Sequence, residues 1–259
     1  MPTSQPGKGV IAAYALLPDY HIVLKTKLEL LGARLSELAG RAAAYRACVD
    51  TAPILEKDAA RRAGLGWIGR NSLLNAPGYG SYLFLGELLT DLELPPDAPL
   101  PGDPCANCRL CVDACPTQAL RPNRSVDARR CLSYLTIEHR GAIPPELRPM
   151  LGRRVFGCDT CQSVCPLNRG IREGTESKAV ISGFPDLLEE FSFSEAEWKA
   201  KYRATPVMRA GFVGYRRNLA IALANSRSPG AALALQAALE SGRTPDLRET
   251  LQWALVQLG

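Results

Sequence analysis

The sequence predicts an α+β fold built from three consecutive parts. Residues 1–100 mix helical and strand patterns, residues 101–170 hold eight of the nine cysteines, and residues 171–259 are rich in Ala and Leu at helical spacing. With 46% hydrophobic and 22% charged residues among 259, the composition is that of an ordinary globular protein with a sizeable core. We therefore expect three domains with these boundaries.

The first part is predicted to alternate between helices and strands. Apolar residues recur at helical spacing from Asp19 to Leu38, and the short segment Tyr45–Asp50 is expected to be a strand. Pro53–Arg62 is predicted to be a helix with proline in its first turn, where the fixed φ of proline suits the backbone. A glycine-punctuated loop follows at Gly64–Gly69, and Ser81–Leu85 is expected to be a second strand.

The remaining parts are separated by a proline-rich linker. Five prolines fall among the eleven residues Leu94–Pro104. From Phe184 onward we expect only helices. Three segments resemble HEAT-type helical repeats: Val207–Ala224, Gly230–Leu239 and Asp246–Leu258.

The chain shows no sequence signal for a membrane or for secretion. No apolar run approaches the ~20 residues that cross a bilayer, and the first eight residues lack the regions of a secretory signal. We expect a cytoplasmic monomer with no membrane partner. In the cytoplasm, clustered cysteines usually indicate metal binding or catalysis because structural disulfides are rare there.

The cysteines of the second part follow the spacing of bacterial ferredoxins. Cys105, Cys108, Cys111 and Cys115, with Pro116 after them, fit C-x2-C-x2-C-x3-C-P. A second, looser run repeats the C-x2-C-x3-C-P ending, with one cysteine far upstream: Cys131, Cys158, Cys161 and Cys165. The pattern predicts two 4Fe–4S clusters. Two zinc sites of four thiolates each are the alternative, because C-x2-C pairs also suit tetrahedral zinc.

In ferredoxins the fourth cysteine of such a run ligates the other cluster. The same pseudo-two-fold pairing assigns one cluster to Cys105, Cys108, Cys111 and Cys165. It assigns the other to Cys115, Cys131, Cys158 and Cys161. Each cluster with its four thiolates adds two negative charges, so the formal charge of +5 falls to about +1 and gives little evidence for a nucleic-acid partner. Cys48, the ninth cysteine, is expected to be a buried, inert thiol in the strand Tyr45–Asp50.

Four stretches carry a resemblance to a known family. They are Val49–Lys57, Ala63–Asn71, Cys131–Thr136 and Gly157–Gln162. Together they resemble the epoxyqueuosine reductases, cobalamin-dependent iron–sulfur enzymes that complete the tRNA nucleoside queuosine. The similarity runs from about residue 14 to 168. Arg209–Asn225 also resembles the start of the family's C-terminal helical region.

The resemblance implies a two-electron, two-proton removal of the epoxide oxygen of epoxyqueuosine as water. An aspartate at the position of Asp50 is the proposed proton donor beside the cobalamin. This role is chemically reasonable, because an alkoxide leaves readily only when protonated and a carboxyl group in a dry pocket holds its proton. The alternative for Asp50 is a helix N-cap, since it stands shortly before Pro53.

The resemblance also implies which residues line the cofactor and the tRNA. Besides Asp50, those expected around cobalamin are Leu74, Leu85, Ser133 and Asp159, with ordinary packing as the alternative. The histidines His21 and His139 lie outside the matched motifs, so we expect cobalamin without a protein imidazole ligand. The candidates for tRNA contact are Arg61, Arg62, Arg70, Arg209, Arg216, Arg217, Phe212 and Tyr215, because Arg and aromatic side chains suit phosphate contact and base stacking. Solvated helix faces are the alternative for each.

Three functions follow from these expectations. The first is reduction of epoxyqueuosine in tRNA, with electrons from an external donor. Family members carry a further segment before the stretch that matches Tyr14–His21, so the resemblance implies a partial cobalamin domain. The second function is therefore a non-catalytic electron-transfer module with its catalytic partner on another chain. The third is a reductive dehalogenase, against which Asp50 argues because a tyrosine donor is usual there.

Overall fold

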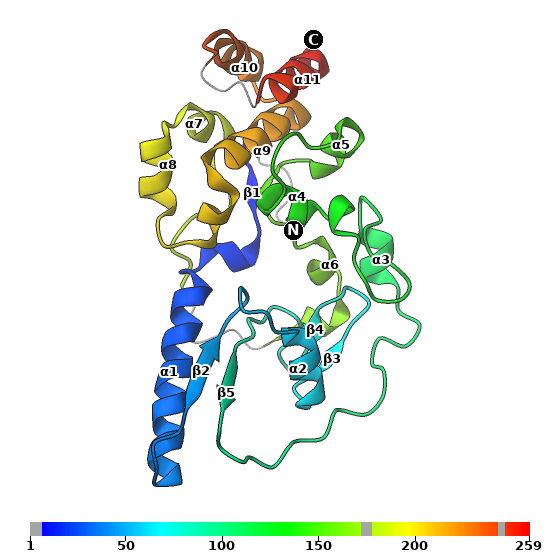
Figure 1. Cartoon of the computed structure of the whole chain (residues 1–259). Helices are drawn as coiled ribbons and strands as arrows, with labels where there is room; N and C mark the ends of the chain where they lie inside the picture. Colours follow the sequence, from blue (N-terminus) through cyan, green and yellow to red (C-terminus); the bar gives the residue numbers. More distant parts are fainter. Residues whose placement is uncertain (1–6, 172–177, 243–246) are drawn as a thin grey trace.

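A computed structural model describes residues 7–171, 178–242 and 247–259. The fold is mixed α/β and mainly helical, and Figure 1 shows two lobes. The smaller lobe contains α1, α2 and β2–β5. The larger lobe contains the remaining helices together with β1 and β6.

A long helix and a two-stranded sheet form the outer edge of the smaller lobe. Helix α1 spans Tyr20–Ala39, and the Asp19 side chain caps it by accepting a hydrogen bond from the N–H of His21. Strand β2 (Tyr45–Cys48) pairs antiparallel with β5 (Glu87–Thr90). The predicted helix and first strand are confirmed, and Cys48 is buried as expected. The helix nevertheless keeps much of its apolar surface exposed: Ile22, Leu30 and Leu38 are each more than 60% exposed.

The rest of this lobe differs from the sequence prediction at two places. Helix α2 spans Glu56–Arg62, so Pro53 lies in the loop before it rather than in its first turn. Strands β3 (Trp67–Ile68) and β4 (Leu74–Asn75) form a short antiparallel pair. The predicted strand at Ser81–Leu85 is wrong, because no neighbouring strand pairs with it within the described part of the chain. The backbone N–H of Ser81 instead donates to the side chain of Asn168, 2.7 Å away.

Short elements surround the cysteines. They are α3 (Leu110–Ala114), η2 (Ala128–Arg130), α4 (Leu132–Ile137), η3 (Pro145–Leu147), α5 (Arg148–Leu151), β6 (Arg154–Phe156), α6 (Thr160–Ser163) and η4 (Pro166–Asn168). The segment Leu94–Pro104 before them has no helix or strand, as its prolines predict. These elements are too short to be stable alone, so the loops between them depend on the packing of the larger lobe and on bound clusters.

Helices of the tail supply the main core. They are α7 (Leu187–Ser192), α8 (Glu195–Tyr202), η5 (Pro206–Ala210), α9 (Gly211–Ser226), α10 (Ala231–Glu240) and α11 (Arg248–Leu258). The predicted segment Val207–Ala224 is divided at Gly211, whose left-handed φ of 68° ends η5 before α9 begins. Gly230–Leu239 corresponds to α10, and α11 falls within Asp246–Leu258, although Asp246 itself lies outside the described residues. No helix that the structure describes is long and apolar enough to span a bilayer.

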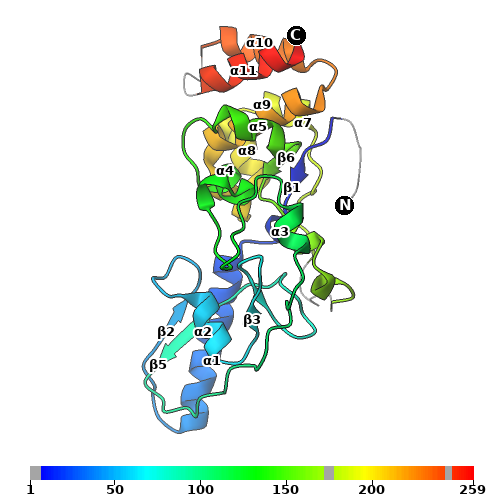
Figure 2. The same cartoon turned by 90° about the vertical axis from the view of Figure 1, so that its right-hand side faces the viewer.

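The N-terminal segment belongs to the larger lobe. Strand β1 (Val10–Ile11) pairs in parallel with β6, and the turn η1 (Ala13–Leu16) follows it. Ile11 and Ala15 pack in the same core as α7–α11. Figure 2 shows this segment crossing from the larger lobe to the start of α1. The segment therefore positions α1 and the residues at its start relative to the cysteine module.

Candidate functional site

One set of four cysteines encloses a small cavity. Cys105, Cys108, Cys111 and Cys165 line a cavity of about 120 Å³ beside α3. Burial raises the pKa of the Cys111 thiol, and the nearby Cys105 and Cys165 thiols raise it further. Cys165 follows α6, which packs against α3. The structure thus brings together the four cysteines that the sequence assigned to the first cluster.

A second set lies deeper in the molecule. Burial raises the pKa of Cys161 to about 12, with further contributions from Cys158 and Cys131. Burial likewise raises the pKa of Cys131, which the Cys158 and Cys115 thiols raise further. The four cysteines predicted for the second cluster therefore lie close enough to interact electrostatically. Thiolates clustered in this way require a positively charged metal core to remain ionised.

A site for a single metal ion such as zinc needs side chains that converge on one point. A zinc ion takes its ligands at about 2.0–2.3 Å, so four of them must converge on one point. Among the described residues, no group of three or more His, Cys, Asp or Glu side chains is arranged to hold one metal ion.

Two cavities adjoin beside the second set of cysteines. The larger, of about 730 Å³, has Cys131, Cys158 and Cys161 in its wall. The smaller, of about 170 Å³, has Asp50 in its wall. The side chains that line both are Tyr14, Lys57, Leu73, Ser81, Leu83 and Phe84. We call the two together the central chamber. A third cavity, of about 950 Å³, meets the larger one at Tyr82, Cys158 and Asp159.

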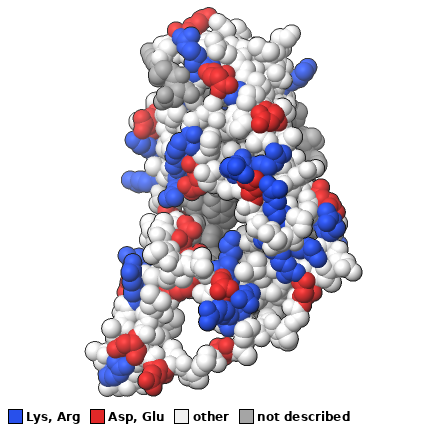
Figure 3. Space-filling view, turned by 45° about the vertical axis from the view of Figure 1, so that its right-hand side comes forward, with Lys and Arg blue, Asp and Glu red and all other residues white. Residues whose placement is uncertain are grey.

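All five residues expected around cobalamin line this chamber. Asp50, Leu74 and Leu85 line the smaller cavity. Ser133 and Asp159 line the larger cavity. Ser133 comes two residues after Cys131, and Asp159 directly follows Cys158; both cysteines are predicted cluster ligands. The Asp159 carboxylate accepts a hydrogen bond of 2.7 Å from the N–H of Ala13, and burial raises its pKa. The chamber lies between the two lobes, where Figure 3 shows a recess with basic and acidic side chains around it.

Asp50 is held in an unusual backbone conformation. Its φ is 48°, a left-handed value that Asp and Asn tolerate better than most residues. The helix after it begins beyond Leu55, so the N-cap alternative for Asp50 is wrong. Its side chain is 51% exposed, which corrects the expectation of a dry pocket: Asp50 stands at the mouth of the chamber. Its backbone N–H donates to the carboxylate of Glu56.

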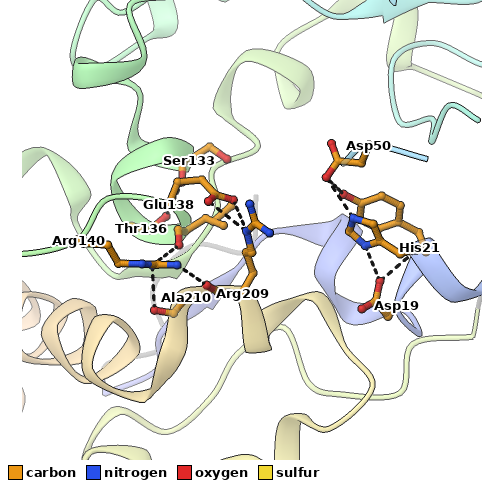
Figure 4. Close-up of polar contacts among 11 residues, drawn as sticks. Asp19, His21, Asp50, Ser133, Thr136, Glu138, Arg140, Arg209 and Ala210 are labelled. Atoms are coloured by element: carbon orange, nitrogen blue, oxygen red, sulfur yellow. Dashed lines mark hydrogen bonds and ion pairs between the residues drawn. The ribbon is translucent and has the colours of Figure 1, made fainter. Parts of the chain in front are cut away.

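Two side chains from the start of α1 hold the Asp50 carboxylate. The Tyr20 hydroxyl donates to Oδ2 over 3.0 Å, and Nε2 of His21 lies 3.1 Å from the same oxygen. Burial and the neighbouring Asp50 raise the pKa of Tyr20, so this phenol remains a donor. Nδ1 of His21 lies 2.8 Å from Oδ1 of Asp19. Figure 4 shows this chain of polar contacts.

The contact between His21 and Asp50 is not predicted by the sequence, in which the two residues lie 29 positions apart. The run Asp19-Tyr20-His21 at the start of a predicted helix was the available signal, because three polar side chains in one turn need partners. Without the fold, those partners could not be named.

A second polar group faces Asp50 across the recess in Figure 4. Nε of Arg209 donates to both carboxylate oxygens of Glu138, over 2.9 and 3.1 Å. Arg140 donates to the carbonyl oxygens of Arg209 and Ala210 and so fixes the backbone of η5. Arg209 is 55% exposed at its side chain and carries its positive charge near Asp50 and Tyr20.

Three of the residues expected to contact tRNA are structural instead. Arg217 is 3% exposed and donates to the carbonyl oxygens of Leu135, His139 and Gly141. Tyr215 is fully buried and donates to the carboxylate of Glu190. The guanidinium of Arg216 stacks between the rings of Phe191 and Phe212, and burial lowers its pKa. The Arg and aromatic side chains of α9 that suggested tRNA contact pack into or against the core instead.

Comparison with known proteins agrees with these features. A family model described as "4Fe-4S double cluster binding domain" matches residues 104–168. A second, described as "Epoxyqueuosine reductase QueG, DUF1730", matches residues 1–51. The first match accounts for the eight clustered cysteines and favours clusters over zinc.

Whole-chain comparisons extend the similarity. An epoxyqueuosine reductase of Pseudomonas aeruginosa is 43% identical over 98% of this chain and 71% of its own length. Solved structures of the epoxyqueuosine reductase of Streptococcus thermophilus and of an epoxyqueuosine reductase with an epoxyqueuosine-modified tRNA-Tyr stem loop are both 34% identical, with TM-scores of 0.91. Each of these two matches covers all of this chain and 69% of the solved chain. The chain, with its double-cluster module beside a chamber entered past Asp50, belongs to the epoxyqueuosine reductase family.

Proposed function

We propose that this protein reduces epoxyqueuosine to queuosine in tRNA, with two 4Fe–4S clusters and cobalamin as its cofactors. One observation carries the proposal: the cavity of Asp50 and the cavity walled by Cys131, Cys158 and Cys161 adjoin and share six side chains. A proton donor and the ligands of an electron carrier therefore face one chamber. A chain that only transferred electrons would have no need of the acid.

The reaction requires two electrons and two protons. Both C–O bonds of the epoxide break, a carbon–carbon double bond forms, and the oxygen leaves as water. The electrons would come from an external donor. Cys108, the exposed member of the eight predicted cluster cysteines, would hold the cluster that accepts them, and Cys158 and Cys161, which wall the chamber, would hold the cluster that supplies them to the site.

The chamber suits a large cofactor. Its main cavity of about 730 Å³ falls in the usual range for ligand sites, and the adjoining cavity at Tyr82 and Asp159 extends it. We assign Leu74, Leu85, Ser133 and Asp159 to its lining. When bound there, cobalamin supplies a low-potential cobalt that can deliver electrons to an epoxide carbon. Neither histidine is expected to bind the cobalt, since Nε2 of His21 faces Asp50 and Nε2 of His139 faces the carbonyl oxygen of Ala142.

Asp50 is the acid of the reaction. Its Oδ2 is engaged by Tyr20 and His21, whereas no described residue forms a hydrogen bond with Oδ1. Oδ1 is therefore the oxygen that delivers a proton to the epoxide oxygen, so that a hydroxyl group rather than an alkoxide is released. The 51% exposure of Asp50 leaves the carboxyl accessible to a base inserted from the tRNA.

The tRNA binds across the recess between the lobes. Arg209 lies at this recess opposite Asp50 and is a candidate phosphate contact, together with Arg61, Arg62 and Arg70. The paired helices α9–α11 form the HEAT-like part of the fold. The proposed boundaries at residues 100 and 170 delimit cofactor, cluster and helical domains along the chain, except that residues 10–16 pack with the helical part. The relative solved with a modified tRNA stem loop supports a tRNA substrate.

The test is turnover by anaerobically purified protein with reconstituted clusters, with and without added cobalamin, on tRNA that contains epoxyqueuosine. Nucleoside mass spectrometry measures the queuosine formed. We expect turnover only with cobalamin, and loss of at least ~100-fold in Asp50→Asn, since general acids typically contribute that much. Asn tolerates the left-handed backbone of residue 50 and so isolates the loss of the proton.

Asp58→Asn, which removes an exposed carboxylate from the neighbouring helix α2, is the matched control and should retain activity. Cluster absorbance should be unchanged in both variants. If the loaded wild-type protein accepts electrons but forms no queuosine, the chain is an electron-transfer module and the proposed activity is wrong.

A further inference from the structure

We infer that Asp19, His21 and Asp50 form a proton relay in which His21 orients Asp50 and returns a proton to it during each turnover. The inference rests on the proposed function, because it concerns the supply of the second proton. It assigns His21 as a positioning and proton-supplying residue that acts through Asp50.

Contacts on both sides of the imidazole decide which nitrogen carries a fixed proton. Oδ1 of Asp19 accepts the N–H of His21 at 3.0 Å as the cap of α1, so this carboxylate is an acceptor. Nδ1 of His21, 2.8 Å from the same oxygen, must then donate. Nε2 is left to exchange a proton with Asp50, 3.1 Å away. This arrangement of carboxylate, imidazole and reacting group follows the logic that orients catalytic histidines.

The ring of His21 has little freedom to turn away. Tyr20 stacks on it with ring centroids 4.3 Å apart, and Phe84 stacks on the other face of Tyr20 at the same separation. Tyr20 and Phe84 also line the smaller cavity. The stack therefore fixes the imidazole beside the wall of the chamber and keeps Nε2 directed at Asp50.

The reaction consumes two protons for each epoxide, and the relay supplies them one after the other. Opening the epoxide takes one proton, and loss of the resulting hydroxyl group as water takes another. The protonated form of the Asp50 carboxyl group supplies one transferable proton, and Nε2 of His21 supplies a second when the ring is protonated. Asp50 gives the proton on Oδ1 to the epoxide oxygen, and Nε2 of His21 then donates a proton to Oδ2. The restored carboxyl group turns its Oδ2–H to the substrate, and this second proton completes the water. Solvent then reloads His21, whose side chain is 33% exposed.

Other titratable and charged groups lie near Asp50 and His21 and affect the pH dependence of proton transfer between them. Glu56 accepts the N–H of Asp50, and burial raises the pKa of that glutamate. Lys57 lines the same cavity, and Arg209 carries its charge near Asp50 from the opposite side. Tyr14 lines the chamber with a pKa that burial raises, so it remains protonated.

The kinetic test compares His21→Gln with the matched control His139→Gln. Glutamine can keep a hydrogen bond to Asp50 but cannot carry the proton. With loaded protein on epoxyqueuosine tRNA, we expect kcat to fall about 10- to 100-fold in H21Q with KM for tRNA unchanged, and one limb of the kcat–pH profile to disappear. H139Q should match the wild type. An H21Q variant with wild-type kcat and pH profile would overturn the relay while leaving the proposed function intact.

A spectroscopic test needs no turnover. The chain has two histidines, so nitrogen-15 spectra of histidine-labelled protein are assigned by comparison with H139Q. We expect the neutral ring of His21 to carry its proton on Nδ1, and Asp19→Asn to weaken this preference. A neutral ring protonated on Nε2 in the wild type would overturn the inference, whatever the activity.

Asp19→Asn also separates the relay from the helix cap. Asn caps helices about as well as Asp, so α1 should persist while the charge beside Nδ1 is lost. We expect kcat to fall about 3- to 10-fold. Asp186→Asn makes the same change at the cap of α7, far from the chamber in the fold, and should leave kcat unchanged. Equal losses in the two variants would assign the effect to helix capping and overturn the relay. A wild-type protein that forms no queuosine would instead show that the proposed function itself is wrong.

Discussion

The guanidinium of Arg217 lies 2.6 Å from the carbonyl oxygen of Leu135, 82 residues earlier in the chain. This contact ties α9 to α4, the helix that directly follows the cluster cysteine Cys131. Two further carbonyl oxygens, those of His139 and Gly141, accept from the same side chain. The tail helix thereby holds the segment that follows Cys131, a predicted ligand of the second cluster.

Replacing Arg217 should therefore affect stability rather than tRNA recognition. Arg217→Ala removes the donor of three carbonyl groups, of which that of Leu135 is buried, and a buried unsatisfied group costs about 1–3 kcal/mol. We expect a loss of about 1–3 kcal/mol, seen as a lower melting temperature with a parallel loss of iron. If Arg217→Ala had a normal melting temperature and iron content but bound tRNA weakly, Arg217 would be a tRNA contact after all.

Arg209 should behave in the opposite way. Because its side chain is exposed and, among the described residues, forms hydrogen bonds to Glu138 alone, Arg209→Ala should leave the melting temperature nearly unchanged. It should weaken binding of the modified stem loop and reduce the salt dependence of binding by about one phosphate contact. Fluorescence titration at several salt concentrations measures both. Arg34→Ala removes another exposed, Glu-paired arginine, from α1, and is expected to leave binding unaffected.

The two cysteine sets can be separated by iron analysis. Cys165→Ser should damage the same cluster as Cys105→Ser, because both line the small cavity beside α3. Cys115→Ser should damage the other cluster, together with Cys131→Ser. Electron paramagnetic resonance of the reduced variants distinguishes the remaining cluster in each case. If Cys165→Ser and Cys161→Ser lost the same cluster, the crossed pairing would be wrong.

Arg70 offers a means to adjust the first cluster. It lines the same cavity, its Nη2 donates to the carbonyl oxygen of Ala106, and its buried Nε has no hydrogen-bond partner within the described chain. An N–H directed at a cluster sulfur stabilises the reduced, more negative state. Arg70→Gln should lower the reduction potential by about 60 mV, equivalent to a charged hydrogen bond of about 1.5 kcal/mol in a one-electron couple. Redox titration measures the shift. The control is Arg124→Gln, because Arg124 pairs with Asp103 and does not line this cavity. A larger shift of the reduction potential in the control would exclude a specific role for Arg70.

Local patterns explain where the sequence prediction succeeded. The cysteine spacing and α1 each depend on residues a few positions apart, so the pattern is visible in a single stretch of sequence. The strand predicted at Ser81–Leu85 failed because β-propensity reports compatibility with a sheet but not the presence of a neighbouring strand. The interpretation of Tyr215 and Arg217 as a binding face failed because one helix has two faces, and the sequence does not state which of them meets the core.

Residue types and their spacing along the chain are enough to predict the chemistry of this protein: eight thiolates at cluster-binding spacing, and an aspartate in a motif that resembles a family of epoxide reductases. Tertiary structure alone decided that His21 and Tyr20 meet Asp50, that Asp50 stands exposed at the mouth of the chamber, and that Arg217 is buried. Metal ligation by a loop is fixed mainly by short-range spacing. Hydrogen bonds between residues 29 or 82 positions apart depend on how whole elements pack, and only the folded chain specifies that.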